Sequence, residues 1–183
     1  MKQLLFAFFL ISSISCFSQN EPQEVTPSVL NRILAEAEKE TADYRKKLKT
    51  DNRTPEEIEF DVERHRLYLI MEKKLAIDFT TYGMNKAASE NAEGYDKLMN
   101  KYYNKLLKLL SAEDKKILVR AQKAWLAFRD AEGEMMGLMM KEEYSGGGTI
   151  QSNIASSNYS SLIIQRTEEI FNYYNTIIIN KKS

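Results

Sequence analysis

The chain has 183 residues, of which 43% are hydrophobic and 28% are charged, and it contains only 7 glycines and 3 prolines. This length suits one well-buried domain with a small additional unit, and this composition is typical of a mostly helical globular protein. Because the 26 basic and 26 acidic residues cancel, no overall field favours nucleic acid or an anionic membrane, and neither is expected as a partner.

The first twenty residues differ from the rest of the chain. Lys2 gives a short positive start, residues 4–14 are mostly apolar, and small or polar residues follow. This pattern predicts a secretory signal peptide over 1–18, cleaved after Ser18, and hence a periplasmic or secreted protein. Lipidation of Cys16 is the less favoured alternative, because the leucine usual three residues before a lipidated cysteine is missing. The apolar run is too short to span a membrane.

Cysteine chemistry is excluded from the mature chain predicted in this way, because Cys16 is the only cysteine. Such a chain has no disulfide, so packing alone must hold an exported fold together. Thiolate metal sites and a cysteine nucleophile are excluded for the same reason. We expect no metal and no cofactor.

A polar tether over 19–27 leads into the first of five expected helices. Thr26 is a suitable N-cap with Pro27 in the first turn, and Thr54-Pro55-Glu56-Glu57 forms a capping box for the second helix. Apolar residues recur at spacings of three and four along every segment. The expected helices run over 28–49, 54–78, 84–110, 111–142 and 150–178.

We therefore predict an all-α protein, a small helical bundle of about five helices. An N-terminal helical pair at 19–79 precedes a compact helical domain at 80–183, which the last three helices form. A glycine inside a helix costs only about 1 kcal/mol. The pattern therefore leaves open whether the second and third helices merge through Gly83.

The only tryptophan, Trp125, lies in the segment Ala121–Asp130. On a helix, Ala121, Trp125, Phe128 and Glu132 fall on one stripe. An aromatic anchor flanked by polar groups needs a packed site in which those groups find partners. We therefore expect this segment to be the core around which the chain is organised.

Arg166 interrupts the apolar stripe of the last helix. A buried guanidinium without a partner costs several kcal/mol, so it needs a carboxylate or a carbonyl, and Asp96 and Asp130 are the best candidates. Polar residues also border the apolar stripes of the third and fourth helices, which predicts one shared buried network. Its expected members are Asp96, Asn100, Gln122, Trp125, Arg129, Asp130 and Arg166.

The carboxylates of this network allow two interpretations. As catalysts, Asp96 with Asp130 or Glu132 would form the acid and base pair of glycoside hydrolysis. As structural groups, they would be neutralised by the arginines, which lowers the pKa of a carboxyl group and spoils it as a general acid. We favour the structural interpretation and predict no catalytic residue.

Three further groups of residues have both a structural and a functional interpretation. The lone His65 shares an apolar helix side and is interpreted as structural, since nothing nearby orients it for catalysis. Four lysines at helical spacing indicate a solvated face rather than an anion-binding strip; they are Lys97, Lys101, Lys105 and Lys108. Four methionines are interpreted as core filling, with an adaptable binding surface as the alternative; they are Met135, Met136, Met139 and Met140.

The one glycine-rich loop lacks the lysine and the preceding buried strand of a phosphate-binding loop, so no nucleotide site is predicted. A flexible hinge explains the loop, and its exposure makes it the candidate segment for binding a protein partner. Its residues are Tyr144, Ser145, Gly146, Gly147, Gly148 and Thr149.

Four features together resemble the lysozyme inhibitor LprI N-terminal-like domain family, over residues 80–175. They are Tyr95-Asp96-x-Leu98-Met99-Asn100, Ala121-Gln122-x-x-Trp125-x-x-Phe128-Arg129-Asp130, the glycine loop and Arg166. The family consists of exported, typically small and helical bacterial proteins, and its name comes from inhibition of lysozyme by one type of member. Members commonly carry cysteines where this chain has Ala87 and Gly133, so the disulfides that the family implies are absent.

The resemblance implies an exported, non-enzymatic binding protein of the cell envelope, with lysozyme-like glycan hydrolases as the target it would inhibit. Many lysozymes are cationic, and residues 19–79 carry 11 basic and 14 acidic groups, whereas the later residues carry 14 and 12. Electrostatic steering would therefore favour the N-terminal pair over the family domain. The alternatives are a small envelope hydrolase that uses Asp96, Asp130 and Glu132, and an assembly or scaffolding protein that uses the methionine-rich surface.

Overall fold

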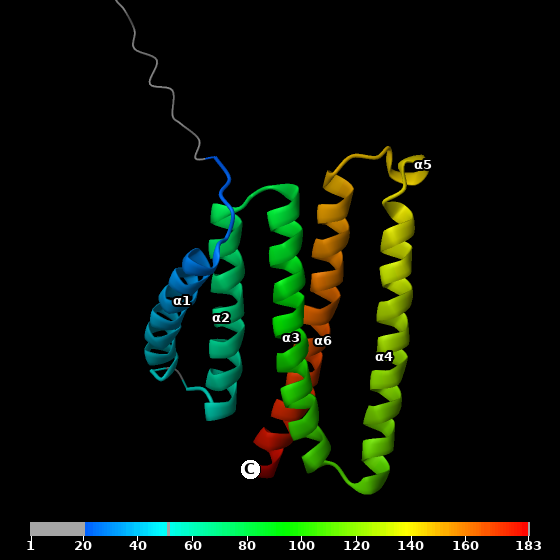
Figure 1. The fold of residues 1–183 in the computed structure, drawn as a ribbon. Helices are drawn as coiled ribbons and strands as arrows, with labels where there is room; N and C mark the ends of the chain where they lie inside the picture. The colour runs from blue at the N-terminus through cyan, green and yellow to red at the C-terminus, as the bar shows by residue number, and fades with distance from the viewer. Residues whose placement is uncertain (1–20, 51, 183) are drawn as a thin grey trace, which may run out of the picture.

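The structure, a computed structural model, describes residues 21–50 and 52–182. In this part of the chain it contains six helices and no strand (Figure 1). The predicted signal peptide, its cleavage after Ser18 and lipidation at Cys16 lie outside the described residues. The helices are α1 (Pro27–Leu48), α2 (Pro55–Ile77), α3 (Thr81–Leu109), α4 (Ala112–Met139), α5 (Glu142–Ser145) and α6 (Ile150–Lys182).

The all-α prediction is confirmed, and the five predicted helices begin and end within a few residues of their expected bounds. The additional helix, α5, is a single turn at the start of the glycine-rich segment. None of the described helices combines the length and the apolar character that crossing a membrane requires.

Side-chain caps fix where the helices begin. Thr54 and Glu57 form the predicted capping box, in which each side chain accepts a hydrogen bond from the other's backbone N–H, at 3.2 and 2.7 Å. Thr80 caps α3 by accepting from the N–H of Gly83 at 3.0 Å. Each cap satisfies a backbone N–H that has no partner inside its own helix. The local sequence therefore sets these boundaries.

The chain turns sharply between α2 and α3. The Asp78 carboxylate accepts hydrogen bonds from the backbone N–H and the hydroxyl of Thr80, at 3.2 and 2.6 Å. Gly83 lies so close to this turn that a β-carbon there would come within 2.1 Å of the Asp78 carboxyl carbon. The two helices are therefore separate, and the missing side chain at Gly83 permits their close connection.

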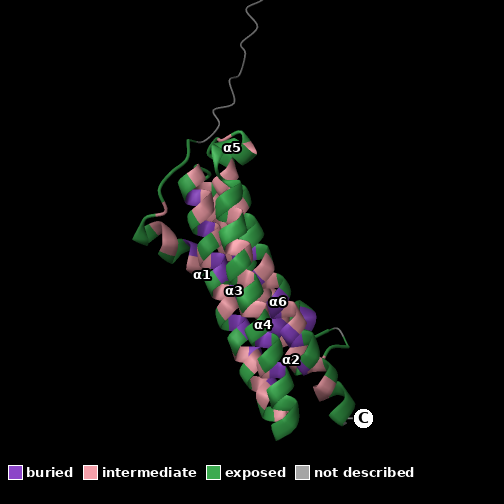
Figure 2. Cartoon of the chain, turned by 90° about the vertical axis from the view of Figure 1, so that its right-hand side faces the viewer, coloured by how far each residue is buried: buried purple, intermediate pink, exposed green. Residues whose placement is uncertain are grey.

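The helices form a bundle with α3 and α6 at its centre. These two run side by side, while α2 packs against α3 and α1 lies outside α2 (Figure 1). On the opposite side, α4 contacts α6 along one edge, and most of its surface is exposed or half-buried (Figure 2). The core cluster is consequently built mainly from α3 and α6, with Phe60 of α2 and Leu118 of α4 added from either side.

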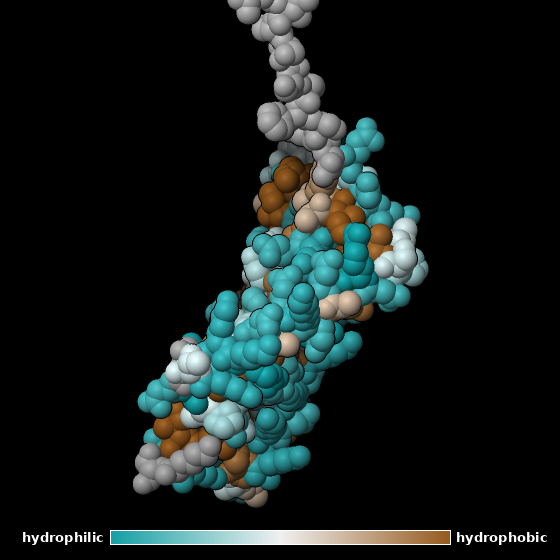
Figure 3. Space-filling model, turned by 90° about the vertical axis from the view of Figure 1, so that its left-hand side faces the viewer, coloured by the Kyte–Doolittle hydropathy of each residue, from teal (hydrophilic) through white to brown (hydrophobic). Residues whose placement is uncertain are grey.

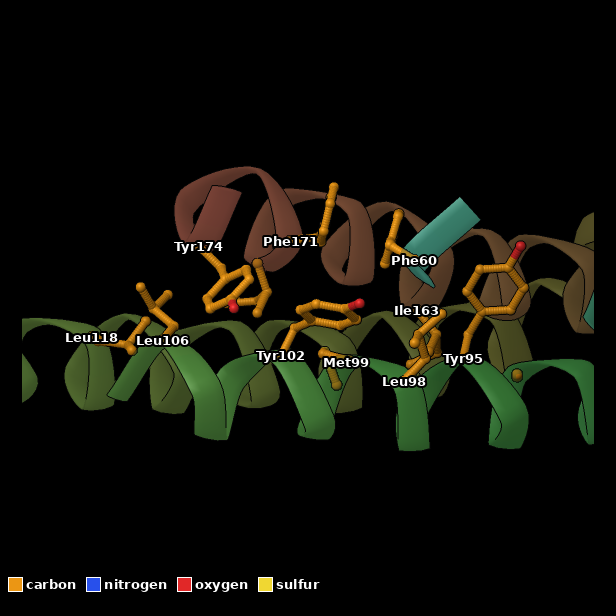
Figure 4. Packing of buried hydrophobic residues seen from close by; sticks show 12 residues of the cluster. Phe60, Tyr95, Leu98, Met99, Tyr102, Leu106, Leu118, Ile163, Phe171 and Tyr174 are labelled. Atoms are coloured by element: carbon orange, nitrogen blue, oxygen red, sulfur yellow. The ribbon is translucent and has the colours of Figure 1, made fainter. Parts of the chain in front are cut away.

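Tyr102 of α3 is the centre of the core, with a side chain that is 0% exposed. Phe60 of α2 stacks on Phe171 of α6 with 3.8 Å between the ring centroids, and the Tyr102 ring lies at a steep angle to both, at 5.3 and 5.0 Å (Figure 4). Tyr174 adds a further edge contact at 5.5 Å. Such aromatic pairs contribute about 0.5–1.5 kcal/mol each beyond their buried area. The N-terminal helical pair therefore shares this core through Phe60.

The predicted central role of the tryptophan segment is wrong. Leu118 and Gln122 are the buried residues of α4, Phe128 is 49% exposed, and Trp125 packs against the core from its edge. The α4 helix reaches the core only through Leu118, Gln122 and Trp125, so much of its apolar stripe stays at the surface. The core is organised around Tyr102 instead.

The hydroxyl group of Tyr102 is buried and has no hydrogen-bond partner among the described residues. We expect Tyr102→Phe to leave the free energy of unfolding unchanged or to raise it by up to about 2 kcal/mol, because an unsatisfied polar group is removed. Tyr102→Ala should lower it by about 3–5 kcal/mol, because it leaves a cavity. Urea unfolding followed by circular dichroism measures both, and a marked loss in Tyr102→Phe would contradict this account.

The alkaline stability of the fold should depend on Tyr95. Burial raises the pKa of its hydroxyl from 10.0 to about 12, while Arg64 opposes and Glu168 reinforces this shift. The unfolded chain thus releases this proton first, so stability is complete below pH 10 and is lost as the pH rises towards 12. Urea unfolding at pH 8 and pH 11 should show a smaller loss in Tyr95→Phe than in the parent, and equal losses would contradict the assignment.

Candidate functional site

Arg166 is buried where α6 faces α4, and it is 7% exposed. Its Nε donates to Oε1 of Gln122 at 3.0 Å, and its Nη1 donates to Oε2 of Glu169 at 2.9 Å. The guanidinium carbon also lies 5.9 Å from the ring centroid of Trp125. Gln122 in turn donates to the sulfur of Met99 at 3.7 Å. These contacts attach α4 to the centre of the bundle.

The prediction that Asp96 or Asp130 pairs with Arg166 is wrong. Glu169, one turn along α6, takes the place that Asp96 and Asp130 were expected to fill. Asp96 accepts a hydrogen bond from Asn100 at 3.0 Å, one turn further along α3. Asp130 is exposed and accepts from its neighbour Arg129 at 2.6 and 2.9 Å. Side chains on the same helix thus satisfy all three groups.

The predicted network is therefore divided between the interior and the surface. Gln122, Trp125 and Arg166 come together as a buried clamp between α4 and α6. Asp96, Asn100, Arg129 and Asp130 form two local pairs outside it, with Asn100 and Asp130 exposed.

Arg129 is the link between these two parts. Its guanidinium carbon lies 5.7 Å from the ring centroid of Trp125. Partial burial by itself lowers the pKa of this guanidinium, but the hydrogen bond to Asp130 and the charges of Asp130 and Asp96 raise it overall. Two arginines thus contact one indole ring, an arrangement that cation–π attraction stabilises.

A groove runs between α4 and the central helices. Its apolar half has a volume of 450 Å³ and is lined by Ser89, Gly133, Met136, Gly137, Met140, Ser152, Ala155, Ser156 and Tyr159. An adjoining polar half of 390 Å³ is lined by Ser89, Ala92, Glu93, Asp96, Lys97, Arg129, Tyr159 and Ile163. Most residues of the apolar half are small, so no side chain fills the space between the helices. We call the two halves together the α4–α6 groove.

The four methionines of α4 do not fill the core. Met135, Met139 and Met140 are 49%, 44% and 42% exposed, and Met136 is half-buried in the wall of the α4–α6 groove. The expectation of core filling is therefore wrong. Their exposure agrees with the alternative interpretation, in which these methionines form an accessible and adaptable surface.

The glycine-rich segment continues from α5 at the same end of the bundle. Gly146, Gly147 and Gly148 have φ angles of 76°, 77° and 91°, which favour glycine. Tyr144 is 55% exposed, whereas the hydroxyl of Ser145 accepts a hydrogen bond from the N–H of Gly147 at 3.2 Å. The segment joins α4 to α6 in a defined turn and presents a tyrosine to solvent.

The other candidates take part in helix packing. The rings of His65 and Tyr44 lie 4.1 Å apart and join α2 to α1. Lys101 pairs with Glu63, and Lys105 lies 4.9 Å from the ring centroid of Tyr102. Among residues 21–50 and 52–182, no group of three or more histidine, cysteine, aspartate or glutamate side chains is placed to hold a metal ion.

These observations define a helical bundle protein with an open groove beside its peripheral helix. The family model of the lysozyme inhibitor LprI matches residues 73–170, more than half of the chain, and the protein belongs to this family. The match begins in the last turns of α2 and includes α3, α4, α5 and most of α6. No curated protein and no solved structure matches the chain. The buried clamp and the α4–α6 groove both lie within the family region.

Sequence reasoning missed this groove. Its signal was present as small residues four positions apart on two helices, at Gly133 and Gly137 and again at Ser152 and Ser156. Small residues at this spacing occupy one helix face. Whether such a face is packed closely or left open depends on the distance between the helices, which the sequence does not give.

The clamp predicts different consequences for two charged residues. Arg166→Met should lower the free energy of unfolding by about 1–3 kcal/mol, because the buried Oε1 of Gln122 loses its donor. Glu169 is partly exposed and keeps its hydrogen bond from Gln165. Asp130→Asn should cost less than about 0.5 kcal/mol, because its ion pair is exposed. Urea unfolding of both variants makes the comparison. Equal losses would show that Asp130 belongs to the buried network after all.

Proposed function

We propose that this protein is an exported, non-enzymatic binding protein of the cell envelope that inhibits lysozyme-like glycan hydrolases. The observation that carries the proposal is the match of the LprI lysozyme inhibitor family to residues 73–170. Export is supported by the leader-like pattern over residues 1–18.

The surroundings of the carboxylates favour binding over hydrolysis. A glycosidase needs one carboxyl group that holds its proton at neutral pH, usually in an apolar or enclosed site. Asp96 lies in an open groove with Lys97 and Arg129, and Asp130 is exposed and bound by Arg129. Neither residue has the surroundings of a general acid, so we place no catalytic residue in this protein.

A protein inhibitor acts by blocking the approach of substrate to the enzyme. This needs an accessible surface on a rigid support, because ordering a flexible segment on binding reduces affinity. The segment from Tyr144 to Thr149 meets the first requirement, since Tyr144 is 55% exposed. The helices α4 and α6 on either side of it supply the support.

The proposal predicts that the purified mature protein slows the hydrolysis of bacterial cell walls by lysozyme, with inhibition that saturates as its concentration rises. Turbidity of a cell-wall suspension measures the rate, and a helical protein of similar size and charge is the control. Unchanged turnover at a large molar excess would reject the inhibitor role. Cell-wall hydrolysis by the protein alone, abolished by Asp130→Asn, would support the hydrolase alternative instead.

A further inference from the structure

We propose that the end of the bundle formed by the last turns of α4, by α5 and by the first turns of α6 is the face that docks a basic protein surface. In this inference the α4–α6 groove receives an apolar side chain of that partner. We call this face the apolar end. Its exposed large residues are Met135, Leu138, Met139, Met140, Tyr144, Ile150, Ile154 and Tyr159. The inference rests on the proposed function, because the basic partner is the lysozyme-like hydrolase.

Exposed apolar side chains are concentrated at this end of the bundle. Fifteen large hydrophobic residues of the described chain are exposed, and eight of them lie within residues 135–159. Ile150 and Tyr144 are the most accessible of these, at 59% and 55% exposed. Single exposed apolar side chains are ordinary, whereas several at one end of a bundle indicate a contact surface. The face over α1 and α2 is mostly hydrophilic by comparison (Figure 3).

The α4–α6 groove opens at this end, and Met140 and Tyr159 of the exposed set belong to its lining. The apolar half of the α4–α6 groove has a volume of 450 Å³, within the range of pockets that bind ligands. A β-carbon at Gly137 would meet no atom within 4 Å, and one at Gly133 would approach Tyr159 only to 3.9 Å. The glycines therefore leave accessible space that a side chain of a partner can occupy. Met136 and Met140 in the wall can adjust to its shape.

The apolar end carries an excess of negative charge. Residues 130–150 contain five acidic side chains and one basic side chain, a balance of −4. They are Asp130, Glu132, Glu134, Lys141, Glu142 and Glu143. Among them, only Asp130 forms an ion pair with another described residue. The remaining acidic groups are therefore free to attract a basic surface.

Several acidic groups of the N-terminal pair, by contrast, form ion pairs with basic residues of the same unit. Glu36 and Glu40 both pair with Lys73, and Glu59 pairs with Arg45 at 2.9 Å. The balance of −3 in this unit is spread over residues 19–79, whereas the balance of −4 at the apolar end falls within residues 130–150. Charge complementarity with a cationic hydrolase thus favours the apolar end, contrary to the expectation from net charge alone.

The same charges argue against two other occupants. An anionic membrane surface would be repelled by the acidic groups around the patch. A second copy of the chain would bring two faces of like charge together, which is unfavourable. A basic protein surface is the occupant that satisfies both the apolar patch and its acidic surroundings.

Binding to a cationic lysozyme tests the groove with a pair of variants at one position. Gly137→Leu places an isobutyl side chain in the groove and should weaken binding by about tenfold or more. Gly137→Ala adds a single methyl group and is the matched control, with affinity within about twofold of the parent. Both substitutions replace an exposed helical glycine, so neither should lower the melting temperature. Biolayer interferometry with immobilised lysozyme measures the affinities.

A second pair of variants tests the charge argument. Glu132→Lys with Glu134→Lys reverses two charges at the apolar end and should weaken lysozyme binding by about tenfold at 0.15 M salt, where exposed charges act only over about 8 Å. Asp43→Lys with Glu72→Lys makes the same change in net charge on the N-terminal pair and should alter binding by less than about twofold. Equal effects of the two pairs would overturn the assignment to the apolar end.

The outcomes separate this inference from the proposed function. Binding without inhibition would reject the inhibitor role but still map the docking face through the variants. Inhibition that none of the apolar-end variants weakens would overturn the docking face alone. No binding to lysozyme by the parent protein would overturn both. Dimerisation of the parent in sedimentation velocity, abolished by Gly137→Leu, would assign the face to a second copy and overturn the inference.

Discussion

The packing of α3 against α6 around Tyr102 is the constraint on which the rest of the structure depends. Phe60 reaches this centre from α2 and stacks on Phe171 of α6, so the N-terminal pair is held by the same aromatic cluster. A protein with no disulfide in its described part has to gain its stability from such burial. The cluster lies mainly on the central helices, α3 and α6, and the other helices are arranged around these two.

The peripheral position of α4 follows from how few of its residues reach that centre. Leu118 belongs to the core cluster, and Gln122 with Trp125 meets Arg166 one and two turns further along. Beyond this point α4 has small residues towards α6, and the helices leave the groove between them. The buried Arg166 thus marks the point along α4 at which contact with the core ends and the accessible groove begins.

The positions of the helices could be predicted from the sequence, because the signals that set them are local. The Thr54 and Thr80 caps and the apolar spacing each act within one or two turns, and the structure reproduces them. The family resemblance was also recognisable from residues such as Gln122, Trp125 and Arg166, which the structure brings together.

Interactions between helices were predicted less well. An apolar stripe shows that a helix has a buried side but not how many neighbours cover it, which is why the segment around Trp125 was mistaken for the core. The partner of Arg166 was sought on other helices, whereas Glu169 on the same helix is closer. The methionines and the groove were misjudged for the same reason, because their exposure depends on a distance between helices that no local pattern contains.

The separation of the aromatic core from the last turns of α4 has a consequence for how such proteins diversify. Side chains such as Met135, Leu138 and Met139 point away from the buried cluster, so substitutions there have little effect on folding. New recognition preferences can therefore arise from changes at these outward positions without disturbing the central helices.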